Sequence, residues 1–154
     1  MNELRAAEGQ PRIQRILVAT DFSVQADRAL QWARTLAEAF QAQISVLHVI
    51  DVFGLGEISN EWGGPDPLPL LREQSRRYMT ELKMQVPDAE TLIREGSPRP
   101  AIVELALELH CDLVVMGTHG RSGLKHLVLG SVAEYVVRHS VVPVFTVRTR
   151  EHRV

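Results

Sequence analysis

Apolar residues follow two different periods along this chain. Short runs rich in valine, isoleucine and leucine, typical of buried strands, alternate with longer segments whose apolar residues recur every three or four positions, as on one face of a helix. The short runs predict strands at residues 13–20, 42–50, 90–95, 112–117 and 142–148, and the periodic segments predict helices at residues 24–40, 70–86, 97–110 and 131–139. Strand and helix therefore alternate along the chain.

This alternation predicts an open α/β fold, in which a five-stranded parallel sheet carries helices on both faces. Crossovers between parallel strands are right-handed, and a reversal of the winding direction after the third strand gives the strand order 3-2-1-4-5. In such a sheet, ligands bind beyond the carboxyl ends of the two strands from which the chain departs in opposite directions. Here these are the first and fourth strands, so residues 19–23 and 117–123 are predicted to face a binding crevice.

Length and composition predict one globular domain over residues 1–154, with a core at about 12–148 and loose termini: the chain is 45% apolar and 23% charged. A formal net charge of -2 argues against a nucleic-acid backbone as the main partner. No apolar run approaches the roughly 20 residues of a membrane span, which predicts a cytoplasmic protein without membrane attachment. Cys111, the single cysteine, excludes an internal disulfide and is expected to pack in the core.

The segment after the fourth strand is rich in glycine, at positions 117, 120 and 123. Glycine tolerates positive φ and a close approach to a ligand, so successive N–H groups of this loop can converge on an anion. Gly130 and Ser131 then precede the last helix, whose first amides suit a phosphate. The loop also has a local positive bias from His119, Arg121, Lys125 and His126. The segment therefore predicts an anion site, although solvated loop charges are the commoner role of such side chains.

Other roles remain open for the key polar residues. Ser131 and Glu134 also fit a capping box, which does not prevent the serine hydroxyl from donating to a phosphate. Asp21 follows the first strand and offers an acceptor to ribose hydroxyls or to an adenine amino group, but either Asp21 or Ser23 is equally suited to cap the next helix. His119 lacks neighbours at the spacing that a metal site needs.

Familiar catalytic and nucleotide motifs are absent from the sequence. It contains no P-loop, no G-x-G-x-x-G after the first strand, no G-x-S-x-G nucleophile elbow and no Cys/His metal spacing. Two alternatives to a binding protein stay open: a slow ATPase or nucleotidyl-transferring enzyme, and a partner-binding module whose cleft is empty. An enzyme would need a base or metal-binding carboxylates, and only Asp21 and Asp51 stand at the strand ends.

Gly117, Gly120, Gly130 and Ser131 form the pattern G-x2-G-x9-G-S, which resembles the ATP-binding signature of the universal stress protein family. Segments 16–23, 45–51, 112–124 and 130–144 are similar to the strands and loops of that family, and the resemblance covers residues 12–148. It implies an adenine nucleotide alpha hydrolase-like fold, ATP bound in the crevice, a homodimer, and a role as a nucleotide-dependent stress-response switch or adaptor with slow hydrolysis or none.

The resemblance also assigns roles to single positions. Asp21 matches the aspartate that contacts the adenosine part, and Val49 matches the position whose backbone contacts the adenine. The four residues of the signature match the cradle of the ribose and the triphosphate. Mg²⁺ is expected only as a companion of the triphosphate, because no set of side chains in the sequence requires it. The other carried-over positions are Thr118, His119, Arg121, Ser122 and Gly123 in the loop, and Val132 after the serine.

The last strand also predicts an oligomer. If it forms the edge of the sheet, the run from Val142 to Arg148 leaves an apolar edge protected only by Pro143 and flanking arginines. Pairing two such edges about a two-fold axis covers both. The sequence therefore predicts a homodimer through this strand.

Overall fold

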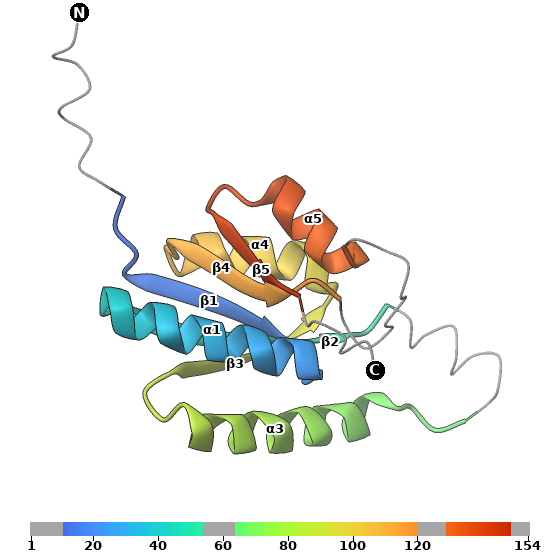
Figure 1. Ribbon diagram of the computed structural model, residues 1–154. Coiled ribbons are helices and arrows are strands. Elements are labelled where there is room, and N and C mark those ends of the chain that lie inside the picture. The colour runs from blue at the N-terminus through green and yellow to red at the C-terminus, as the bar shows by residue number, and fades with distance from the viewer. Residues whose placement is uncertain (1–10, 54–63, 120–128, 149–154) are drawn as a thin grey trace, which may run out of the picture.

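The structure, a computed structural model, describes residues 11–53, 64–119 and 129–148 (Figure 1). Strand and helix alternate as predicted, and most bounds lie within two residues of those expected. The strands are β1 (Arg15–Thr20), β2 (Gln43–Asp51), β3 (Glu90–Gly96), β4 (Leu113–Gly117) and β5 (Val144–Val147). The helices are α1 (Val24–Phe40), α3 (Leu68–Gln85), α4 (Pro98–Glu108) and α5 (Ser131–His139).

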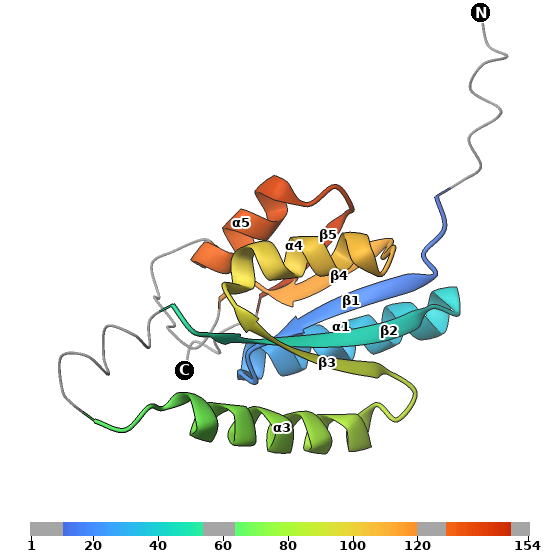
Figure 2. The ribbon, with the colours of Figure 1, turned by 180° about the vertical axis from the view of Figure 1, so that it is seen from behind.

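The five strands form one parallel sheet in the order β3-β2-β1-β4-β5, which confirms the predicted topology. Figures 1 and 2 show α1 and α3 on one face of the sheet and α4 and α5 on the other. The direction of winding reverses between β1 and β4, because β1 leads to α1 and β4 leads to α5 on the opposite face. The carboxyl ends of these two strands are therefore the switch point.

The central strand β1 is buried on both faces, which explains its continuous apolar sequence. Ile16, Leu17 and Val18 are each 0% exposed. Ile16 and Val18 belong to the cluster under α1 and α3, whereas Leu17 belongs to the cluster under α4 and α5. Each such side chain contributes about 1.5–3 kcal/mol by leaving water. This burial holds the carboxyl end of β1 in a fixed position between its neighbours.

The edge strand β5 begins two residues later than the sequence predicts. The Ser140 hydroxyl donates to the Val142 carbonyl oxygen at 2.8 Å and accepts from the Val142 amide at 3.2 Å. Val142 is thus held in a turn before the strand, and Pro143 contributes only its carbonyl, which accepts from the Val114 amide at 3.0 Å.

Among the helices of the described ranges, none is long and apolar enough to cross a membrane.

Candidate functional site

A cavity of about 440 Å³ lies at the carboxyl ends of β1, β2 and β4, where the sequence analysis places a site. Its wall follows the carboxyl ends of these strands and includes residues of α1, α3, α4 and α5. We call it the cleft. Eight of the twelve predicted binding positions line it: Asp21, Val49, Gly117, Thr118, His119, Gly130, Ser131 and Val132. The other four, Gly120, Arg121, Ser122 and Gly123, lie outside the described residues.

The turn between β1 and α1 forms one side of the cleft and is held by its own side chains. The Asp21 Oδ1 atom accepts from the Ser23 amide at 3.0 Å, and the Ser23 hydroxyl accepts from the Ala26 amide at 3.2 Å. Ser23 is therefore the N-cap of α1, which decides the alternative left open by the sequence. Asp21 instead shapes the turn before the helix, and it also lines the cleft.

Phe22, inside this turn, has φ +61°, a left-handed conformation that bulky side chains rarely adopt. Its amide donates to the Thr20 hydroxyl at 3.0 Å, which fixes the bend. Its ring lies 4.3 Å from the His48 ring and 5.1 Å from the Tyr78 ring, measured between centroids. The bend therefore carries the aromatic ring onto β2 and α3, where it forms part of the wall.

His48 is a member of this wall that the sequence analysis missed. Its Nδ1 atom lies 2.9 Å from the Thr20 carbonyl oxygen, and a carbonyl only accepts, so Nδ1 carries the proton. Side chains alternate along β2, and Val46 lies in the cluster under α1 and α3, which places His48 on that same face. The alternation was available from sequence, but the ring stack requires the bend at Phe22.

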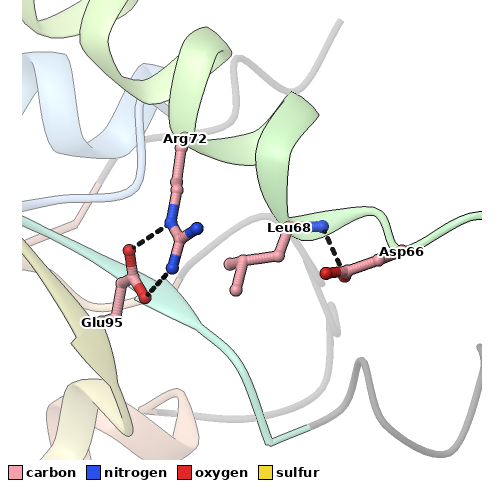
Figure 3. A network of polar contacts seen from close by, with 4 residues as sticks. All are labelled: Asp66, Leu68, Arg72 and Glu95. Atoms are coloured by element: carbon pink, nitrogen blue, oxygen red, sulfur yellow. Dashed lines mark hydrogen bonds and ion pairs between the residues drawn. The ribbon is translucent and has the colours of Figure 1, made fainter.

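The start of α3 supplies another part of the wall and is tied to the sheet (Figure 3). Asp66 Oδ1 accepts from the Leu68 amide at 3.0 Å, and Arg72 forms two hydrogen bonds with Glu95 of β3, at 2.6 and 2.9 Å. One turn later, Ser75 is 5% exposed and lines the cleft. The hydrogen bond to Arg72 holds the pKa of Glu95 below its usual range.

The structure explains the glycine at position 117 by packing, whereas the sequence analysis explained it by the approach of a ligand. A Cβ atom there would lie 3.1 Å from Gln25 Cβ and 3.3 Å from the Gln25 carbonyl carbon. The end of β4 thus packs directly against the first turn of α1. Among the described glycines only Gly96 has positive φ, so Gly117 does not use the left-handed conformations that glycine allows, and Gly130 has φ -68°.

The capping-box prediction for Ser131 is also wrong. Gly130 is the N-cap of α5 without any side-chain cap hydrogen bond, and Ser131 is the first residue of the helix. Glu134 instead accepts from Arg138 at 2.9 Å. Ser131 is exposed and lines the cleft, with its hydroxyl and amide at the positive end of α5. The Gly130 amide donates to the Thr118 carbonyl at 2.6 Å, which joins the two glycine segments.

The charges on the cleft wall are sparse. Its described residues include the carboxylates Asp21 and Asp51 and the imidazoles His48 and His119, and none of them is a lysine or arginine. Over residues 11–53, 64–119 and 129–148, no group of three His, Cys, Asp or Glu side chains gathers to hold a metal ion. The wall is otherwise apolar, with Leu47 and Met116 buried behind it. Such a cleft suits a flat organic group with a few polar contacts.

Comparison with known proteins agrees with this geometry. Residues 12–148 match the model of the universal stress protein family. The universal stress protein MJ0531 of Methanocaldococcus jannaschii is 31% identical over 144 residues, which cover 91% of this chain and 85% of that protein. The solved structure of MJ0577 from the same organism has a TM-score of 0.79 at 29% identity, and the match covers 90% of this chain and 98% of that one.

A universal stress protein solved in complex with cAMP is also similar, with a TM-score of 0.66 at 28% identity over 90% of this chain and 99% of that one. These neighbours have the adenine nucleotide alpha hydrolase-like fold that the resemblance implied.

Proposed function

The chain belongs to the universal stress protein family, and on this premise we propose that it binds an adenine nucleotide, ATP before others, in the cleft. The observation that carries the proposal is the convergence of Asp21, Val49, Gly117, Gly130 and Ser131 on one cavity, although they come from four segments of the chain. The similar protein solved with cAMP supports an adenine nucleotide as the class of ligand.

In this proposal the base occupies the apolar part of the cleft, between Val49 on β2 and Ile102 on α4. Asp21 accepts from the adenosine part, and the backbone of Val49 contacts the adenine. The phosphates lie toward Ser131, whose free helix amide and hydroxyl are donors to anionic oxygen. Thr118, His119 and Val132 border the ribose and phosphate region, and the predicted contacts of residues 120–123 complete the cradle.

We assign the protein the role of a nucleotide-dependent stress-response switch or adaptor that hydrolyses ATP slowly or not at all. The support is chemical: hydrolysis needs a positioned base or a metal, and Asp21 Oδ1 and Asp51 Oδ1 each already accept a backbone amide, from Ser23 and Phe53. Mg²⁺ fits here only with the triphosphate, whose oxygens would supply most of its ligands. Turnover near one per second or faster would favour an enzyme instead.

The assembly is proposed as a cytoplasmic homodimer of a single domain, joined through β5. Among the described strands, β5 is the last in the sheet order and pairs with β4 alone. Beside it, the Phe145 ring lies 5.8 Å from Trp32, which is 44% exposed and extends the apolar surface onto α1. Pairing with a second copy would cover both the open edge and this ring pair. Sedimentation that finds a monomer at tens of micromolar contradicts this assembly.

The direct test of nucleotide binding is to denature freshly purified protein and to identify the released nucleotide by chromatography. Binding is then measured for the Gly130→Val variant, whose backbone at φ -68° and ψ 160° accommodates valine. We expect this variant to lose nucleotide and to keep its fold and oligomeric state. Gly64→Val, at an open position, is the matched control. Binding retained in Gly130→Val would contradict the proposed cradle.

A further inference from the structure

The described part of the cleft wall carries two carboxylates and no lysine or arginine. Each phosphate added to a nucleotide adds negative charge, so a cation beyond these residues would favour the longer phosphate chain. We propose that Arg99, which lies outside the cleft, binds the terminal phosphates and makes the site prefer ATP and ADP to AMP. This inference rests on the proposed function.

A shallow groove of about 370 Å³, lined in part by Arg99, borders the cleft. It shares four of its residues with the cleft wall: Asp51, Pro98, Ser131 and Val132. The groove therefore begins at the first residues of α5, where the phosphates are proposed to lie. Phe53, Ser97 and Arg99 form the rest of its wall. A phosphate chain that extends past Ser131 would therefore enter the groove that Arg99 lines.

Arg99 is placed to act on an anion in this groove. It occupies the first turn of α4, where Pro98 and Pro100 fix the backbone on either side of it. The ion pairs between described residues use other arginines, Arg72, Arg94 and Arg138, and Arg99 is in none of them. A guanidinium can bind a phosphate through two parallel hydrogen bonds, which a lysine cannot do. Ser97, the N-cap residue, makes no side-chain cap hydrogen bond and adds a hydroxyl to the same wall.

Asp51 sharpens the effect of Arg99 on selectivity. Asp51 lines both the cleft and the groove, so its negative charge disfavours a terminal phosphate that no cation balances. The α-phosphate, which AMP also has, lies nearest the amides of α5 and depends least on Arg99. Removing Arg99 should therefore weaken ATP strongly, ADP next and AMP very little. The same reasoning predicts that raising the salt concentration weakens ATP more than AMP in the natural protein.

The test is calorimetric titration of AMP, ADP and ATP, with Mg²⁺ absent and then present, into the natural protein, Arg99→Gln and Arg99→Lys. Arg34→Gln is the matched control, because Arg34 is exposed on α1, on the other face of the sheet, and its loss changes the net charge equally. We expect Arg99→Gln to lower the affinity for ATP about tenfold and that for AMP less than twofold. Arg99→Lys should fall between, and Arg34→Gln should change neither.

The outcomes separate the two proposals. If the natural protein binds none of the three nucleotides, the proposed function fails and this inference fails with it. If it binds them and Arg99→Gln weakens AMP and ATP by the same factor, or changes neither, only the inference about Arg99 is overturned. Thermal unfolding of each variant confirms that the protein titrated is folded.

Discussion

Replacing Gly117 with alanine tests whether this position serves the packing of β4 on α1. The new Cβ atom would lie 3.1 Å from Gln25 Cβ, 3.3 Å from the Gln25 carbonyl carbon and 3.4 Å from its oxygen. Two of these atoms are backbone, in a helix turn that the Ser23 cap fixes. They cannot rotate away, so the whole start of α1 must move by a few tenths of an ångström.

The expected cost follows from two opposing effects. Overpacking of this kind costs about 1–3 kcal/mol, whereas replacing glycine by alanine gains about 0.4–1 kcal/mol by restricting the unfolded chain. The net loss is about 1 kcal/mol in the free energy of unfolding, or roughly 2–4 °C in Tm for a chain of this size. Gly64→Ala provides the control, because nothing lies within 4 Å of its added Cβ. Gly64→Ala therefore gains stability from the restricted unfolded chain without any cost of overpacking.

Urea unfolding followed by circular dichroism measures both variants against the natural protein. The two substitutions make the same chemical change, so packing is the main difference between them. We expect Gly117→Ala to be less stable than the natural protein and Gly64→Ala to be as stable or slightly more stable. A Gly117→Ala protein as stable as Gly64→Ala would refute the packing explanation.

Three further predictions concern other parts of the fold. Ser23→Ala removes the N-cap of α1 and should cost about 1 kcal/mol in chemical unfolding, whereas Thr35→Ala, on the exposed side of the same helix, should not destabilise the protein. Arg72→Gln should remove stability at pH 7: the pKa of Glu95 is lowered by Arg72, so the ion pair stabilises above the ordinary carboxyl value of 4.5. The difference between this variant and the natural protein should shrink as the pH falls below that value, and a constant difference in unfolding titrations would contradict this origin. Cys111 is 5% exposed and burial raises the pKa of its thiol, so a thiol reagent at pH 8 should react at least about tenfold more slowly with native than with unfolded protein, and equal rates would argue against its burial.

The fold was predictable because its signals are local and repeated. The apolar period identifies each strand and helix, and the limited ways of winding a parallel sheet give the order of the strands. The residues from Val24 to Phe40 and from Ser131 to His139 were predicted with the observed bounds. The edge strand was less predictable, since its first residues are drawn into a turn by the Ser140 hydroxyl, a contact that no periodicity reports.

The candidate site was predictable in position but not in chemistry. Strand order alone brings Asp21 and Gly117 to the same cleft. The roles of individual residues depend on distances of a few tenths of an ångström, such as the approach of Gln25 to Gly117, and on the bend that turns Phe22 toward His48. The sequence analysis also missed Tyr78 as a cleft residue, because it lies on α3, 28 positions after Ile50 at the end of the predicted second strand, and meets the cleft only after folding.

The pairing of β1 with β4 has a consequence for synthesis on the ribosome. Hydrogen bonds at this junction join the amide of Gln14 to the carboxylate of Asp112, 98 positions later. A nascent chain that has released β1, β2 and β3 can assemble three of the five strands, but β1 keeps an open apolar flank until β4 leaves the exit tunnel. Before β4 leaves the tunnel, the side of the cleft that β4 and the residues after it supply is missing. Any ligand of this cleft can therefore meet only a nearly finished chain, and the interval before β4 arrives is when β1 is most exposed to wrong partners.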